Sequence, residues 1–162
     1  MLLVSDMIRC PQGGILVVDG VVLSAWTEAY DEAAVTLLGN AVAEASHRHP
    51  DALAAIGIYR IKRLREMPSA ETRARLAAMG KSQPFKVMVT VLDSSGFGNA
   101  LIRLFLTGLT NLLGKNSPMT IAESIDVGLS QVAATGIDIS KLRPALVMLT
   151  TEVIGVSVIN AT

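Results

Sequence analysis

Short apolar runs alternate along this chain with segments of helical periodicity, and this alternation limits the possible folds more than any other feature. Three of the runs read ILVVDGVVLSAW (Ile15–Trp26), ALAAIGIYRI (Ala52–Ile61) and FKVMVTVL (Phe85–Leu92). A strand that is apolar at nearly every position is buried on both faces. Strands that alternate with helices pair in parallel through right-handed crossovers. The sequence therefore predicts an α/β fold with a mixed, mostly parallel sheet and helices packed on it.

The first run predicts an N-terminal hairpin. Asp19 and Gly20 stand between its two apolar halves. This dipeptide favours a type I′ turn, in which both central residues have positive φ. A later segment, PMTIAE (Pro118–Glu123), predicts one more short strand.

Helical periodicity and capping residues predict four helices. The first has Asp31 and Glu32 at its favourable end and is stopped by Pro50. Ser69 and Ser124 are candidate N-caps, because a serine hydroxyl accepts hydrogen bonds from N–H groups of the first turn. A glycine follows the last turn of the second, third and fourth predicted helices. The predicted helices cover residues 30–47, 69–80, 99–113 and 124–136.

Length and composition predict a single domain that needs cover for apolar surface. The 162 residues suit one α/β domain at 1–138 with an apolar C-terminal extension at 139–162. Mean hydropathy is +0.48 and only 17% of residues are charged, which favours a subunit interface. Fourteen basic and fourteen acidic residues leave no net field to attract nucleic acid.

The helix at 99–113 is apolar on nearly every face, and Arg103 is its only charged residue. A helix that is apolar all round is buried all round. The sheet covers one side, so the C-terminal extension or a second copy of the chain must cover the other. Both remain open. We favour a homo-oligomer interface, formed by Leu101, Phe105, Leu109, Leu146 and Met148.

The turn before this helix, Asp93-Ser94-Ser95-Gly96, has two interpretations. Asp, Ser and Gly are ordinary residues where a strand gives way to a helix, because their side chains bond to nearby backbone groups. The same turn also lies at the carboxyl edge of the predicted sheet, where ligands bind. N–H groups of a helix there would stabilise a phosphoserine. These four residues are therefore a candidate phosphoacceptor turn.

The DSSGFG stretch resembles the phosphorylation loop of STAS domains, the family of anti-sigma factor antagonists and sulfate-transporter tails. The sequence after this stretch is similar to SpoIIAA-like domains of the kind found in myxobacterial proteins. The similar segments read GFGNALIRLFLTGLTNLL and SIDVGLSQVAATGID. In STAS domains the turn follows the first helix and the next strand, whereas here the segment 69–92 intervenes. The resemblance implies an α/β fold with an N-terminal hairpin. It also implies Ser95 as phosphoacceptor with Asp93 beside it.

A second cluster of interest is basic. Arg60, Lys62, Arg63 and Arg65 follow the second apolar run, and Arg73 and Arg75 come shortly after. They form either a solvated rim or a site for an anion or an acidic partner. Nucleic acid is a poorer match because no aromatic residues are interleaved with these charges.

Signatures of catalysis, metal binding and export are missing from the sequence. It has no glycine-rich phosphate motif and no nucleophile elbow, so we expect no enzyme and no cofactor. His47 and His49 lack neighbouring ligands for a metal, and the lone Cys10 excludes a disulfide framework. We expect a cytoplasmic location, since neither an export signal nor an apolar run of ~18 residues is present.

These features predict a non-enzymatic domain that acts through protein–protein contacts, with itself or with another protein, and that is regulated at the serine turn. The alternative is a small-molecule or lipid-binding module of SpoIIAA-like fold. Such a module would use an apolar pocket beside the helix at 99–113, with the basic rim at an anionic head group.

Overall fold

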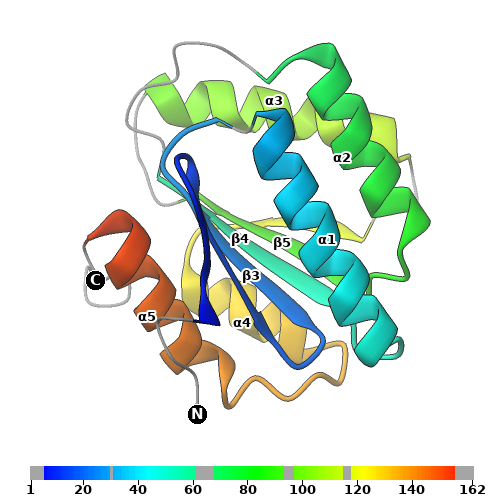
Figure 1. The fold of residues 1–162 in the computed structure, drawn as a ribbon, viewed down its shortest axis with the longest axis vertical. Coiled ribbons are helices and arrows are strands. Elements are labelled where there is room, and N and C mark those ends of the chain that lie inside the picture. Colours follow the sequence, from blue (N-terminus) through cyan, green and yellow to red (C-terminus); the bar gives the residue numbers. More distant parts are fainter. Residues whose placement is uncertain (1–5, 30, 61–67, 93–96, 115–117, 156–162) are drawn as a thin grey trace.

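A six-stranded sheet carries helices on both faces in the computed structural model (Figure 1). It describes residues 6–29, 31–60, 68–92, 97–114 and 118–155, and within 97–114 the side chains of 97–99, 101, 102 and 105 lie outside the description. In chain order the elements are β1 (Ile8–Cys10), β2 (Gly13–Val18), β3 (Val21–Trp26), α1 (Glu32–Arg48), β4 (Ala54–Tyr59), α2 (Ala70–Ser82), β5 (Val87–Leu92), α3 (Phe97–Leu113), β6 (Met119–Ala122), α4 (Ile125–Ala133) and α5 (Leu142–Ile154).

The strands lie in the sheet in the same order as in the sequence, β1-β2-β3-β4-β5-β6. β1, β2 and β3 form an antiparallel meander, whereas β3, β4, β5 and β6 pair in parallel. The predicted α/β fold with a mixed, mostly parallel sheet is confirmed. β1 was not predicted, because three residues that are largely exposed leave no apolar pattern.

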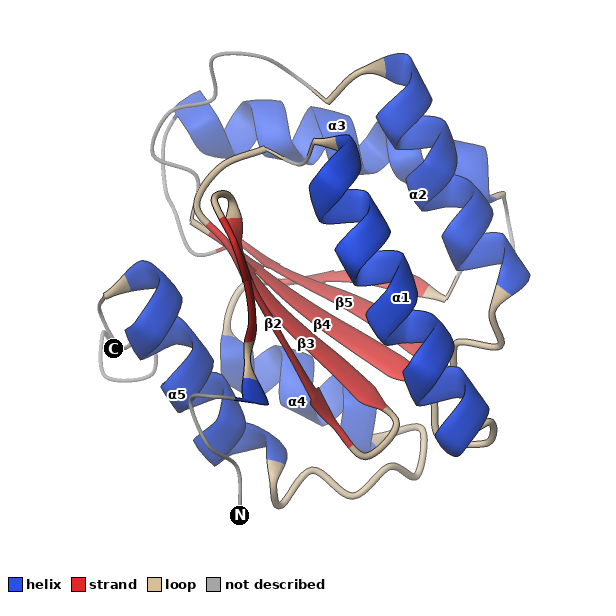
Figure 2. Cartoon of the chain, in the orientation of Figure 1, coloured by secondary structure: helices blue, strands red, loops and turns tan. Residues whose placement is uncertain are grey.

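Helices divide between the two faces according to their place in the chain (Figure 2). The crossover helices α1, α2 and α3 cover one face, and α4 and α5 cover the other. Parallel strands that advance in one direction through crossovers of one hand put all crossover helices on the same face. The side chains of β3, β4 and β5 are therefore buried on both sides, as their apolar runs predict.

The hairpin forms, but its turn differs from the predicted type I′. Val18 pairs with Val21, so the loop has two residues, of which Asp19 alone has a positive φ, at 53°. Gly20 is needed for another reason. A Cβ there would lie 2.5 Å from the carbonyl oxygen of Ala52, which the backbone approaches closely. The glycine thus lets the hairpin pack against the segment that leads into β4.

Most of the predicted helix ends are confirmed. The hydroxyls of Ser69 and Ser124 accept hydrogen bonds from the backbone N–H of Thr72 and of Val127, each over 3.1 Å. Gly114 and Gly136 have φ near +90° after the ends of α3 and α4. The predicted end of the second helix at Gly80 is wrong, since α2 continues to Ser82. A Cβ at Gly80 would lie 2.7 Å from the side chain of Leu113, so this glycine allows α2 and α3 to approach closely.

The C-terminal extension packs on the chain itself as far as the structure describes it. α5 buries Leu142, Ala145, Leu146 and Leu149 against β2 and β3. Ion pairs join it to distant parts of the chain. Arg9 in β1 contacts Glu152 over 2.8 Å, and Arg143 contacts Asp126 in α4. α5 is thus part of the core of this chain. It lies on the face of the sheet opposite α3, so in the described residues it does not cover the outer side of α3.

We predict that Leu146→Ala lowers the free energy of unfolding by ~2–5 kcal/mol, because it leaves a cavity between α5 and the sheet. The single tryptophan, Trp26, is fully buried and reports unfolding by fluorescence in a denaturant titration. Val127→Ala is the matched control, since this α4 side chain is 46% exposed and its loss should cost less than about 0.5 kcal/mol. Equal losses for the two variants would contradict the packing of α5.

Candidate functional site

The carboxyl edge of the parallel strands holds one described residue of the predicted sites. Arg60 follows β4 directly, and its backbone N–H donates to the carbonyl oxygen of Trp26 over 2.9 Å. Tyr59 and Leu92, the last residues of β4 and β5, are paired. The chain therefore leaves β4 and β5 at the same edge of the sheet. The other residues of the predicted basic site and of the predicted phosphoacceptor turn lie outside the described residues. They are Lys62, Arg63, Arg65, Asp93, Ser94, Ser95 and Gly96.

The predicted interface residues lie in different surroundings. Leu146 is fully buried in the core, and Met148 is half-buried beside it. Met148 also lines an open hollow of about 780 Å³ between the β2–β3 hairpin and α5, where Lys141 and Asp19 form an ion pair of 3.6 Å. Leu109 is half-buried against the core on the other face of the sheet. The side chains of Leu101 and Phe105 lie outside the described residues.

An apolar cavity lies between the sheet and the layer of α1, α2 and α3. It encloses about 90 Å³. A single water needs only ~10–15 Å³, so the cavity has room for several waters or for a small organic group. Side chains from all three helices and from β3, β4, β5 and β6 reach it, including Leu38, Leu76, Leu106 and Leu109.

The cavity exists because one row of the sheet carries small side chains. The register sets Ser24, Gly57 and Thr90 side by side in the middle of β3, β4 and β5. The row on the amino side (Val22, Ala55, Met88, Met119) also lines the cavity, whereas the row on the carboxyl side is large (Trp26, Tyr59, Leu92). The cavity therefore lies over the middle row and over the row on its amino side.

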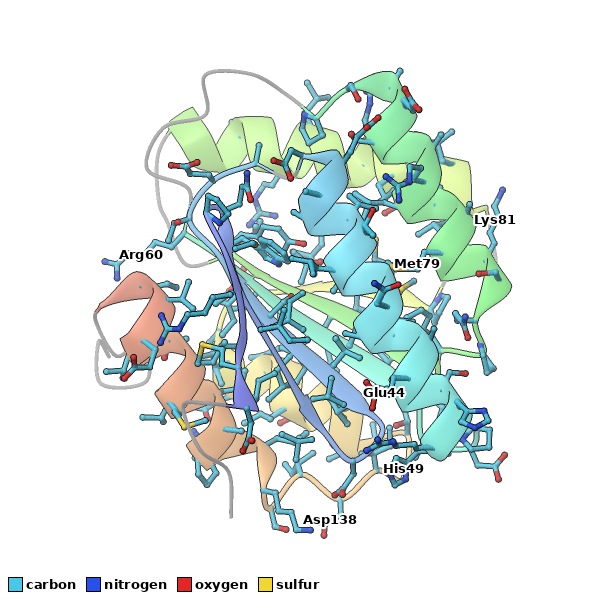
Figure 3. All side chains as sticks on the ribbon, viewed as in Figure 1. Glu44, His49, Arg60, Met79, Lys81 and Asp138 are labelled. Carbon is cyan, nitrogen blue, oxygen red and sulfur yellow. The ribbon has the colours of Figure 1, made fainter. Side chains whose placement is uncertain are left out.

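The mouth of the cavity lies toward the amino ends of β5 and β6. Lining residues at that end are half-buried: Met79, Phe85, Met88, Leu113 and Met119. Those at the inner end, such as Ser24 and Leu106, are buried. Figure 3 shows Met79 between α1 and α2, well apart from Arg60 at the opposite edge of the sheet. Arg60 is thus not placed at the cavity mouth.

Three hydroxyl groups face the trough. Ser24, Thr90 and Tyr59 are 5%, 6% and 9% exposed. Burial raises the pKa of the Tyr59 hydroxyl well above its ordinary value, so this group stays neutral and can donate a hydrogen bond.

Among the described residues that line this cavity, none carries a charge. Within the described ranges, no group of three or more His, Cys, Asp or Glu side chains could hold a metal ion. Over the same ranges, no helix is both long and apolar enough to cross a bilayer. The chemistry that the cavity offers is apolar contact together with a few hydroxyl hydrogen bonds.

Comparison of the chain with protein-family models, curated proteins and solved structures finds no match. The resemblance to STAS and SpoIIAA-like domains therefore stays a prediction.

None of the trough residues was singled out from the sequence, although a signal was present. Ser24, Gly57 and Thr90 are each the fourth residue of a six-residue strand whose other positions are apolar. A small or polar residue at one position of a strand is ordinary. Only the strand register shows that the three positions form a continuous row.

We predict that Tyr59 stays protonated far into the alkaline range. Its pKa is raised in the folded state, so above a pH of about 10 the unfolded chain holds fewer protons and stability falls as the pH rises. Ultraviolet titration of the two tyrosines should show one ionising only together with unfolding. Tyr59→Phe should remove that late step. If both tyrosines ionise near pH 10 in the folded protein, Tyr59 is not buried.

Proposed function

We propose that the chain is a non-enzymatic binding domain that holds a small, largely apolar ligand in the cavity between the sheet and α1, α2 and α3. The observation that carries the proposal is the Ser24–Gly57–Thr90 row, which opens a trough with buried hydroxyls in an otherwise apolar core. Ligand pockets commonly combine apolar walls with a few polar groups that fix orientation.

The energetics of an empty cavity favour an occupant. Protein interiors are close-packed, so side chains around a hollow of about 90 Å³ lack contacts that the rest of the core has. Water would meet few hydrogen-bonding groups in this cavity, because aliphatic and methionine side chains dominate its lining. An organic ligand would restore the lost contacts with these walls. Methionine suits such a site because its flexible side chain adapts to different shapes.

Methionine methyl groups allow a direct test of the wild-type protein. Met79, Met88 and Met119 line the cavity, whereas Met7 and Met148 lie against the core on the opposite face of the sheet. In NMR spectra of protein labelled at the methionine methyls, small molecules from a fragment library should shift the first three signals and leave the other two. If no compound moves the three cavity signals, the proposal is overturned.

A variant that blocks the cavity provides the matched comparison. Ala55 lines the cavity in the row next to Gly57 and is half-buried. We expect Ala55→Leu to abolish the ligand-induced shifts, because the larger side chain fills the space near the mouth. Trp26 fluorescence establishes whether the variant is folded. Unchanged binding by a folded Ala55→Leu protein would place the ligand elsewhere.

A protein contact through α3 is the second candidate function, and it continues the expectation from the sequence. Leu104 and Leu112 are 66% and 48% exposed, and they stand eight residues apart with Gly108 between them. Residues spaced by four lie on one face of a helix. A Cβ at Gly108 would meet open space. An apolar stripe of this kind is a typical contact surface for a second protein.

We predict that the wild-type chain sediments as an oligomer in analytical ultracentrifugation, and that the double variant Leu104→Ser, Leu112→Ser shifts it to monomer. Val127→Ser is the control, since Val127 is 46% exposed but lies on α4, on the opposite face of the sheet. A monomeric wild-type protein at all concentrations would contradict self-assembly through this stripe.

A further inference from the structure

We infer that the ligand of this cavity is an unbranched alkyl carboxylate, whose tail lies over the row on the amino side and whose carboxylate stays at the mouth beside Lys86. The inference rests on the proposed function and specifies its ligand class. Two features of the cavity carry it: an inner end that is closed by a side chain, and a lysine at the mouth.

Tyr59 closes the inner end of the cavity. A Cβ built on Gly57 would lie 3.0 Å from the Tyr59 ring and 3.3 Å from its hydroxyl oxygen, so this side chain already covers the space over the glycine. The space left for a ligand therefore lies over the row on the amino side, where Ala55 stands between the larger Val22 and Met88. A ligand that enters from the mouth ends against Tyr59.

The walls over this row fit an apolar tail. The row itself is apolar throughout, and aliphatic side chains of α1, α2 and α3 cover it, Leu38, Leu76 and Leu109 among them. None of the described lining residues is charged, so a carboxylate inside would lose its hydration without gaining a counter-charge. The charged end of an amphiphile consequently stays at the mouth.

A lysine lies at this mouth. Lys86 follows Phe85 and stands two residues before Met88, and both neighbours line the mouth. Its backbone N–H donates to the carbonyl oxygen of Leu53 over 2.8 Å, so the pairing of β4 with β5 continues through it. Side chains alternate between the faces of a strand, which puts Lys86 on the same face as Met88 and nearer the amino edge. The exposed ammonium of Lys86 is thus available to a carboxylate there.

The basic residues that the sequence singles out are less suited to this role. Arg60 is the described member of the predicted basic site, and it lies at the carboxyl edge of the sheet, well apart from Met79 near the mouth (Figure 3). A ligand whose tail fills the cavity therefore presents its head group to Lys86 and not to Arg60.

The volume limits the part of the tail that is enclosed. A cavity of ~150 Å³ holds benzene, and this one encloses about 90 Å³. On this scale about four carbon atoms fit inside, so in an acid of about six carbon atoms the carboxyl end reaches the mouth.

Three probes with the same tail separate the ligand classes. Hexanoate carries a negative charge, 1-hexanol is neutral, and hexylammonium carries a positive charge. Each is titrated into the full-length chain at neutral pH while the methyl signals of Met79, Met88 and Met119 are followed. We expect hexanoate to bind more tightly than 1-hexanol by roughly two- to fivefold, as an exposed ion pair allows, and hexylammonium to bind least tightly. The preference for hexanoate should shrink at high salt concentration.

Variants of Lys86 locate the head group. Lys86→Gln should make hexanoate and 1-hexanol bind equally and should leave the affinity for 1-hexanol unchanged. Lys86→Glu should reverse the order, so that hexylammonium binds more tightly than hexanoate. Lys141→Gln is the matched control, because Lys141 is also exposed but lies at the hollow beside α5, where it pairs with Asp19. Trp26 fluorescence confirms that each variant is folded.

The outcomes distinguish the inference from the proposed function. Equal binding of hexanoate and 1-hexanol by the wild-type chain, or a preference for hexanoate that survives Lys86→Gln, overturns the head-group site and leaves the cavity as a binding site. Tighter binding of 1-hexanol or hexylammonium overturns the carboxylate class. If no probe and no library compound moves the three methionine signals, both proposals fail.

Discussion

Burial of the three central strands on both faces is the constraint on which the remaining structure depends. Each of β3, β4 and β5 places apolar side chains alternately toward the crossover helices and toward α4 and α5. Neither layer of helices could be lost without exposing half of these side chains to water. The same constraint explains why the C-terminal extension is apolar. α5 supplies the cover that β2 and β3 need on the face opposite α1.

The cavity locally interrupts the close packing between the sheet and the helices α1, α2 and α3. Side chains of ordinary size in the middle row would let α1, α2 and α3 pack directly on the sheet. Ser24, Gly57 and Thr90 are small instead, and the hollow extends from them over the row on their amino side. Protein interiors are otherwise close-packed. A row of small side chains beside an apolar hollow is consequently informative about function.

The sequence alone was sufficient for most of the architecture and for little of the site. Strands and helices were predictable because apolar runs, capping serines and terminal glycines are local signals, and Ser69 and Ser124 do act as caps. The turn at Asp19 and Gly20 was predicted with the wrong backbone, since the close approach of Ala52 is a tertiary contact that no local pattern contains. The position of α5 was ambiguous for the same reason, because its apolar face fits a neighbouring subunit as well as the sheet. The trough depends on register between strands more than thirty residues apart along the chain, which a single sequence does not display.

The ion pair between Arg9 and Glu152 joins residues 143 positions apart, and α5 as a whole closes over strands made near the beginning of the chain. During synthesis β2 and β3 therefore emerge long before the helix that covers one of their faces. Contacts of such large sequence separation slow folding and leave apolar surface open in the meantime. Among the described elements of the core, α5 is thus the last to be synthesised. A shortened chain that ends before α5 would leave this face of β2 and β3 uncovered.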